Sequence, residues 1–217
     1  MVQHVLFDLD GTLTDSRSGI TQSWAHALRS LGHEPPTLQA LEQYIGPPTR
    51  DVARSLLQSA DPALVERCVA VYRERYATVG LFENAVYPGI DALLAALAAD
   101  GHTLFICTSK PTVYAQRIAE HFGLARFLRA VYGCELDGTR ADKAELLRYI
   151  LEQERIAPQN AVLIGDRMHD VRAARHAGVH AIGVLYGFGS RDELVAAGAT
   201  LLCASAAEVR DVVRGLG

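Results

Sequence analysis

The chain has 217 residues, 49% of them hydrophobic and 21% charged, with a formal net charge of −4. This composition predicts a globular protein that is long enough to bury a sizeable core. A slightly acidic chain without any block of Lys or Arg offers nothing to attract nucleic acid. No apolar run reaches membrane-spanning length, and the apolar stretch before the first Asp is too short for a signal peptide.

The cysteines indicate the compartment. They are widely spaced and include no Cys-x-x-Cys pair: Cys68, Cys107, Cys134 and Cys203. This pattern is typical of buried thiols in a reducing compartment and argues against a disulfide framework or a zinc site. We therefore expect a cytoplasmic protein.

A pair of acids follows the first apolar run. The segment from residue 5 to residue 10 reads Val-Leu-Phe-Asp-Leu-Asp, which places Asp8 and Asp10 where a strand gives way to a turn. Side chains two residues apart in a strand point to the same side, so the two carboxylates are expected to converge. Such a pair can hold a divalent metal, or divide the roles of nucleophile and general acid/base. A turn with solvated acids is the structural alternative, whereas Leu13 and the lack of a terminal Glu disfavour a calcium loop.

Residues 15–85 contain helical patterns where a second strand would otherwise be expected. Helices are predicted to begin near Ser16, Thr37, Thr49 and Asp61. Asp61 is a good N-cap residue, and Pro62 after it suits the first position of a helix. The segment therefore predicts an all-helical insert.

From residue 86 onward, short apolar runs alternate with helical patterns. The predicted strands cover residues 103–108, 129–133, 160–165, 180–186 and 200–203. Gly123 and Gly178 are typical of helix C-termini, and Pro111 is typical of a first helical turn. The alternation predicts a parallel sheet flanked by helices, in which ligands gather at the carboxyl ends of the strands.

Three further stations lie where these strands end or helices begin. Thr108 closes one apolar run, Lys143 opens a helical pattern, and Asp166 and Asp170 follow the run at residues 161–164. Acids at a helix N-terminus are also favoured for purely structural reasons. In this order, after the first acid pair, these stations resemble the haloacid dehalogenase (HAD) superfamily. The resemblance covers nearly the whole chain and is closest to the phosphoglycolate phosphatase-like branch.

This resemblance implies an α/β fold with two domains. The core, residues 1–14 and 86–217, is expected to be a Rossmann-like parallel sheet flanked by helices, and residues 15–85 are expected to form a small helical cap. The implied activity is magnesium-dependent hydrolysis of a small-molecule phosphate monoester through an aspartyl-phosphate. A β-phosphoglucomutase-like sugar phosphomutase, a 5′-nucleotidase and a pyrophosphatase remain open on the same core. Residues 186–194 are similar to a loop of phosphoglycolate phosphatase-like and nucleotidase-like relatives.

The resemblance also implies a role for each station. The expected assignments are Asp8 as nucleophile, Asp10 as general acid/base, Thr108 and Lys143 as phosphate-binding residues, Asp8, Asp166 and the Asp10 main-chain oxygen as magnesium ligands, and Asp170 as a support for the metal and a partner of Lys143. A carboxylate attacks a phosphate dianion only where positive charge surrounds the phosphorus, which magnesium and Lys143 would supply. Carboxylates without clustered His or Cys favour magnesium over zinc.

Some neighbours of the stations are weaker candidates. The backbone amides of Gly11 and Thr12 are candidate phosphate ligands, because a tight turn can form an anion nest; a structural turn is the alternative. Ser109 is a candidate through its backbone. Lys110 is expected to be a solvated neighbour, and His169 is assigned no catalytic role.

Other chemistries of the superfamily fit less well. Dehalogenases of the family lack the second acid, present here as Asp10. Phosphonatase chemistry requires a cap lysine, and residues 15–85 contain no Lys. A non-enzymatic binding module would not need a full set of chemical stations.

One candidate for substrate recognition lies in the predicted cap. Arg50 follows the stiff Gly46-Pro47-Pro48 turn between two predicted helices, which resembles a specificity loop. Its planar guanidinium could bind a carboxylate or a second phosphate on the substrate. The structural alternative is a solvated pair with Asp51.

Overall fold

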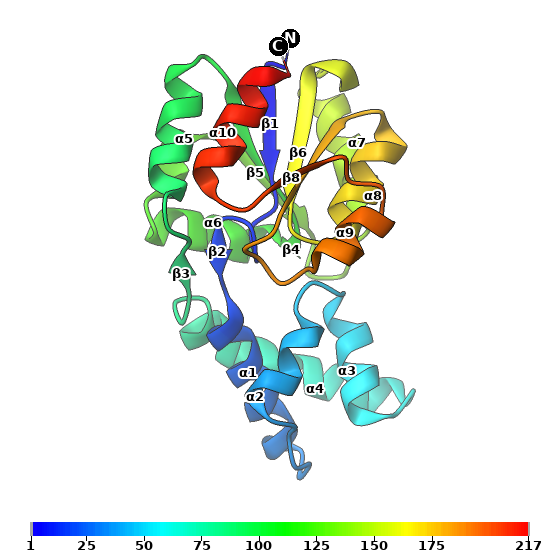
Figure 1. Ribbon diagram of the computed structural model, residues 1–217. Helices are drawn as coiled ribbons and strands as arrows, with labels where there is room; N and C mark the ends of the chain where they lie inside the picture. Colours follow the sequence, from blue (N-terminus) through cyan, green and yellow to red (C-terminus); the bar gives the residue numbers. More distant parts are fainter. Residues whose placement is uncertain (1, 217) are drawn as a thin grey trace. The chain divides into compact units, whose positions relative to one another are not determined.

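The computed structural model describes residues 2–216. The chain divides into two compact units, Met1–Asp15 with Val86–Gly217, and Ser16–Ala85 (Figure 1). The boundary follows Asp15, one residue beyond the expected position. The larger unit contains a six-stranded sheet, and the smaller unit is built from helices.

The sheet of the larger unit is parallel throughout, with the strand order β5-β4-β1-β6-β7-β8 (Figure 1). Its strands are β1 (His4–Phe7), β4 (Thr103–Pro111), β5 (Leu128–Cys134), β6 (Ala161–Gly165), β7 (His180–Val184) and β8 (Leu201–Cys203). This confirms the predicted fold class. The chain passes from β1 to β4 on one side and later to β6 on the other, so the strand order reverses at β1. Ligand crevices form at such switch points, outside the carboxyl ends of the strands.

Two strands end two or more residues away from their predicted ends. β4 continues to Pro111 because its end pairs again with β5, where Pro111 lies opposite Cys134 after a register shift. Pro111 is consequently both the last residue of the strand and the N-cap of the next helix. β7 ends at Val184, two residues before the predicted end, because the chain then enters the loop at residues 186–189.

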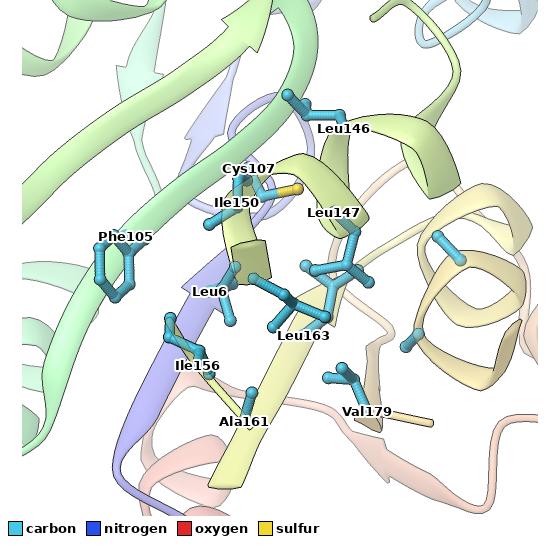
Figure 2. Close-up of a cluster of buried hydrophobic side chains, with 13 residues drawn as sticks. Leu6, Phe105, Cys107, Leu146, Leu147, Ile150, Ile156, Ala161, Leu163 and Val179 are labelled. Carbon is cyan, nitrogen blue, oxygen red and sulfur yellow. The ribbon is translucent and has the colours of Figure 1, made fainter. Parts of the chain in front are cut away.

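Helices flank this sheet. They are α5 (Ile90–Ala99), α6 (Thr112–His121), α7 (Lys143–Gln153), α8 (Met168–Ala177), α9 (Arg191–Ala196) and α10 (Ala206–Gly215), with short 3-10 turns η3 (Leu124–Phe127) and η4 (Pro158–Asn160). Gly178 ends α8 in the left-handed conformation, as predicted. Figure 2 shows α7 packed on the sheet through Leu147 and Ile150, which meet Leu6 and Leu163. This apolar layer fixes the helix that begins at Lys143.

The smaller unit begins its helices where the sequence predicts. It contains α1 (Arg17–Ser30), α2 (Leu38–Leu41), η1 (Glu42–Tyr44), α3 (Thr49–Leu57), α4 (Pro62–Arg75) and a π-helical turn, η2 (Tyr76–Gly80). Asp61 caps α4 by accepting a hydrogen bond from the Ala63 amide at 3.0 Å. The core of the unit includes Trp24, which stacks on Tyr72 with ring centroids 4.1 Å apart.

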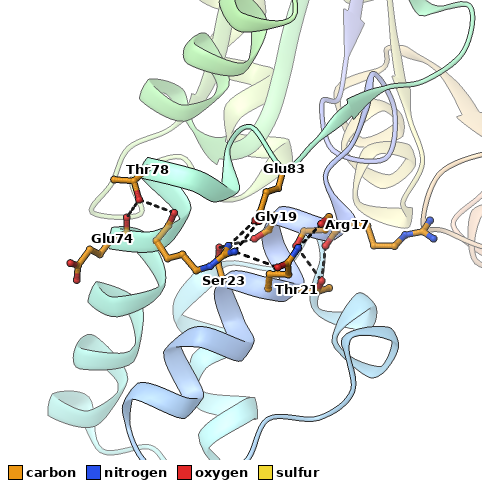
Figure 3. Close-up of polar contacts among 10 residues, drawn as sticks. Arg17, Gly19, Thr21, Ser23, Glu74, Thr78 and Glu83 are labelled. Atoms are coloured by element: carbon orange, nitrogen blue, oxygen red, sulfur yellow. Dashed lines mark hydrogen bonds and ion pairs between the residues drawn. The ribbon is translucent and has the colours of Figure 1, made fainter.

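The first and last helical turns of the smaller unit are tied to each other. The guanidinium of Arg75 donates to both carboxylate oxygens of Glu83, at 2.8 and 3.0 Å, and to Ser23 Oγ at 3.0 Å. The Gly19 amide donates to the Glu83 carbonyl at 2.9 Å, and a Cβ on Gly19 would lie only 1.9 Å from the Gly80 carbonyl oxygen. Figure 3 shows these contacts converging on Ser23 and Glu83. The two ends of the unit are therefore held together.

Two short strands, β2 (Thr14–Asp15) and β3 (Ala85–Val86), pair where the chain passes between the units. All four cysteines are free and buried, as the sequence predicted. Among the described residues, none of the helices combines the length and the apolarity needed to cross a membrane.

Candidate active site

The register of the central strands brings the predicted stations to one edge. Phe7 of β1 lies opposite Ile106 of β4 and Ile164 of β6. The residues that follow these three positions therefore lie side by side at the carboxyl edge of β1 and β6, and they include Asp8, Thr108 and Asp166. The Asp8 amide donates to the Ile164 carbonyl at 2.8 Å, which fixes the first acid at the end of its strand.

Lys143 is buried among three oxygen atoms. Its Nζ lies 2.7 Å from Asp8 Oδ1, 2.9 Å from Asp170 Oδ1 and 2.9 Å from the carbonyl oxygen of Cys107. Burial alone would lower the pKa of Lys143, but the carboxylates of Asp170 and Asp8 outweigh it and raise the pKa. The ammonium is therefore firmly charged, and the expected pairing of Lys143 with Asp170 is present.

Three buried carboxylates form a cluster of metal-ligating type. Oxygen atoms of Asp8, Asp166 and Asp170 all lie within 4.8 Å of one another. Burial and the charges of Asp8 and Asp170 raise the pKa of Asp166 well above its ordinary value. Burial also raises the pKa of Asp170, although Lys143 opposes the shift. The cluster is thus short of positive charge.

The second acid of the first pair has its own counter-ion. Lys110 Nζ lies 2.8 Å from Asp10 Oδ1, and both side chains are largely buried. The prediction that Lys110 is a solvated neighbour is wrong, because β4 continues past Thr108 and carries Lys110 along the edge of the sheet. Around the site, four carboxylates then face two ammonium groups, which leaves two formal negative charges. A divalent cation with oxygen ligands would match this deficit.

The turn after the acid pair uses its amides internally. The Gly11 amide donates to the Thr14 carbonyl at 2.8 Å, and the Thr12 amide donates to the Leu9 carbonyl at 3.3 Å. Both amides therefore have an acceptor within the turn, and their role as phosphate ligands stays a prediction.

Thr12 instead supports the third acid through its side chain. Its Oγ1 donates to Asp166 Oδ1 at 3.4 Å, and its carbonyl accepts a hydrogen bond from the Tyr186 hydroxyl at 3.1 Å. Thr108 is buried, and its Oγ1 accepts a hydrogen bond from the Lys110 amide at 3.3 Å. The Ser109 carbonyl accepts from Cys134 Sγ at 3.0 Å. Thr108 and Ser109 therefore lie at the same edge as Asp8.

The loop after β7 is a part of the site that the sequence did not assign. The Phe188 amide donates to Asp166 Oδ2 at 2.7 Å. Cβ atoms built on Gly187 and Gly189 would lie 2.4 Å from Asp166 Cβ and 1.9 Å from the Asp166 carbonyl oxygen. Gly11, whose φ is +85°, approaches the same carboxylate from the other side, since its Cβ would lie 2.2 Å from Asp166 Oδ2. The sequence indicates this Gly-rich loop only through the family resemblance, although its two glycines are a signal of close backbone approach.

Arg50 of the smaller unit pairs with a residue that the sequence did not suggest. Its Nε donates to Glu66 Oε1 at 2.6 Å and a terminal nitrogen donates to Oε2 at 3.3 Å, which joins α3 to α4. Asp51 pairs with Arg54 instead, at 2.7 Å. The hydrogen bond and charge of Arg50 lower the pKa of Glu66. Any substrate anion would have to compete with this carboxylate for Arg50.

The whole arrangement has a clear counterpart among known proteins. The family model described as haloacid dehalogenase-like hydrolase matches residues 5–184. The chain belongs to this family. It is 50% identical over 212 residues to a 5′-nucleotidase of Pseudomonas aeruginosa, covering 97% of this chain and 95% of that protein. It is 36% identical to tyrosine-protein kinase PtkA of Mycobacterium tuberculosis, covering 99% of this chain and 72% of that protein.

Further similarities indicate to which branch of the family the chain is related. The chain is 30% identical to a phosphoglycolate phosphatase of Pseudomonas putida, over 85% of this chain and 70% of that protein, which confirms the predicted branch. The solved structure of a predicted phosphatase from Clostridium acetobutylicum has a TM-score of 0.94 and 39% identity, covering 99% of both chains. This HAD chain is a phosphatase, and its buried Asp cluster suits the divalent metal that HAD hydrolases generally use.

The close packing around Asp166 predicts that a larger residue at position 189 would disturb the site. In Gly189→Ala the new methyl would overlap the Asp166 carbonyl, and backbone cannot yield as a flexible side chain would. We expect phosphatase kcat/KM to fall by about tenfold or more, with a lower Tm. Gly215→Ala is the matched control, since its Cβ would meet nothing within 4 Å. Equal behaviour of the two variants would show that the loop tolerates a displaced Asp166.

Proposed function

We propose that the chain hydrolyses small phosphate monoesters through a phosphorylated Asp8, with Mg²⁺ as the cation. The observation that carries this proposal is the contact of Asp8 with Lys143 at 2.7 Å inside the Asp8–Asp166–Asp170 cluster. A structural ion pair would not need two further buried acids beside it, because each adds repulsion. A site that binds a divalent cation does need such acids, and the bound cation would then attract the phosphate anion.

The donor set fits magnesium. Asp8 and Asp166 would supply carboxylate oxygens and Asp10 its main-chain oxygen, with Asp170 in support. Hard oxygen ligands and the absence of His or Cys from the cluster match this ion. When bound, the cation would neutralise the carboxylates and draw electron density from the phosphoryl oxygens.

The side chains can carry out the reaction in two steps. In the first, an oxygen of Asp8 bonds to phosphorus as the ester P–O bond breaks, and Asp10 gives its proton to the leaving alcohol. In the second, water attacks the phosphorus, Asp10 takes a proton from that water, and the bond to Asp8 breaks to release inorganic phosphate. Lys143 and Thr108 would hold the phosphoryl oxygens during both steps.

Substrate class is proposed from the names of the relatives. Nucleoside 5′-monophosphates are the first substrates to test, given the relative named 5′-nucleotidase, followed by phosphoglycolate. Release of inorganic phosphate without its transfer to a second hydroxyl would separate hydrolysis from phosphomutase chemistry.

The nucleophile can be tested directly. In Asp8→Asn we expect phosphatase turnover to fall by about a thousandfold or more, because the anionic attacker is lost. In Asp10→Asn we expect a phosphoryl group to accumulate on Asp8, seen by mass spectrometry of the intact protein and its peptides. Asp192→Asn, on the exposed face of α9, is the isosteric control. Near-normal turnover in Asp8→Asn would rule the mechanism out.

The cation can be tested without turnover. Because Asp166 is held beside two other acids, Mg²⁺ at about a hundred times its Kd should stabilise the fold by about 2.7 kcal/mol and raise Tm by roughly 5–10 °C. In Asp166→Asn, the metal-free protein should be at least as stable as the parent, since a repelling charge is gone, and the Mg²⁺-dependent rise in Tm should vanish.

Removal of the cation by chelation tests whether phosphatase activity depends on it. EDTA should abolish phosphatase activity, and Mg²⁺ should restore it. Restoration by Zn²⁺ alone, or a full Tm response in Asp166→Asn, would contradict the assignment.

We also propose that Arg50 recognises an anionic group at the far end of the substrate. Arg50→Ala should then lower kcat/KM by roughly tenfold for an anionic substrate and leave a small ester with an uncharged tail nearly unaffected. Arg54→Ala, which breaks the neighbouring surface pair with Asp51, is the matched control. Equal losses on both esters, or no loss on either, would leave Arg50 as a structural partner of Glu66.

A further inference from the structure

The buried pair between Lys110 and Asp10 is not explained by the fold. A lysine at the end of a strand ordinarily extends its ammonium into water, and burying that charge is unfavourable unless it is paired. Here the Lys110 side chain is only 6% exposed and that of Asp10 14%, and Nζ lies 2.8 Å from Oδ1. The partners are 100 residues apart in the sequence, so the tertiary structure brings them together.

The backbone at Lys110 is held firmly enough to aim its side chain. The Lys110 amide donates to Thr108 Oγ1 at 3.3 Å. On the β5 side, a Cβ on Gly133 would lie 2.2 Å from the Lys110 carbonyl oxygen, so the two backbones are in close contact. Cys134 Sγ fixes the preceding residue through the Ser109 carbonyl. The direction of Lys110 is therefore set by the β4–β5 pairing.

The two lysines of the site serve different acids. Lys143 contacts Asp8 and Asp170, whereas Lys110 contacts Asp10. Lys110 occupies one oxygen of Asp10, which leaves the other oxygen to carry a proton. The carboxylate is thereby fixed in one orientation at the edge of the site.

We propose that Lys110 is a positioning residue that acts through Asp10, an inference that rests on the proposed function. When Asp10 gives its proton to the leaving oxygen, the resulting carboxylate stays beside the Lys110 ammonium. When Asp10 takes a proton from water, the same ammonium has kept its carboxylate aligned. Lys110 itself exchanges no proton and forms no bond to phosphorus.

The dependence on the leaving group separates this role from phosphate binding. An alkyl phosphate needs a proton on its leaving oxygen, whereas 4-nitrophenyl phosphate has a much better leaving group and needs it far less. In Lys110→Met we expect kcat/KM for the alkyl ester to fall by at least tenfold more than kcat/KM for 4-nitrophenyl phosphate. Lys110→Arg should recover most of the loss on the alkyl ester, since it keeps the charge beside Asp10.

A double-mutant cycle tests whether Lys110 acts through Asp10. In an Asp10→Asn background, Lys110→Met should cause no further loss on either ester, because the group it positions is gone. A further loss on either ester in the Asp10→Asn background, or equal losses on both esters in the parent, would overturn the inference and make Lys110 a phosphate ligand or a structural residue. Tm of every variant is measured alongside, and Lys110→Gln replaces Lys110→Met if the latter does not fold.

Failure of the underlying function gives a different result. If Asp10→Asn itself loses activity equally on both esters, Asp10 is not the general acid and the inference falls with it. If Asp10→Asn is selective for the alkyl ester and Lys110→Met is not, the mechanism stands and only the role of Lys110 is refuted.

Discussion

Repulsion among four carboxylates at one edge of a parallel sheet is the constraint on which this site depends. Lys143 offsets it at Asp8 and Asp170, and Lys110 offsets it at Asp10. Asp166 accepts hydrogen bonds from the Phe188 amide and the Thr12 hydroxyl, while burial and the charges of Asp8 and Asp170 raise its pKa. Folding therefore builds a cluster of acids whose negative charge is only partly neutralised, which suits the binding of a divalent metal ion.

The backbone packs tightly around Asp166, and this packing fixes the position of its carboxylate. Gly11 approaches it from the turn after β1, and Gly187 and Gly189 approach it from the loop after β7. Side chains at these positions would push the acid out of the cluster. The loop after β7 thus belongs to the site although it presents backbone and not a charged side chain to Asp166.

The smaller unit shows a different use of close packing. The near contact of Gly19 with Gly80 and the bonds from Arg75 to Glu83 and Ser23 join its first and last helical turns. The Arg50–Glu66 pair adds a competing carboxylate, so any substrate anion recognised there must displace an internal partner.

Local patterns were sufficient to predict much of the molecule. The sequence of strand ends placed Asp8, Thr108 and Asp166 at a common edge, since parallel strands share a carboxyl side. N-cap residues such as Asp61 and the helix stop at Gly178 depend on hydrogen bonds and dihedral angles within a few residues, and the helices begin and end there. The presence of the HAD family stations in chain order was likewise visible without any coordinates, and the family match agrees with it.

Only the tertiary structure decided which groups meet. Lys110 was expected in solvent, yet the extension of β4 buries it against Asp10, and Glu66 rather than Asp51 pairs with Arg50. The Gly11 and Thr12 amides donate to carbonyl groups of their own turn, a pairing that the sequence did not indicate. The sequence alone determined which charged residues stand at the ends of strands and the starts of helices, because capping and strand patterns depend on neighbours within a few residues. The partner of each charge was decided by strand register and packing between distant segments, which no local pattern records.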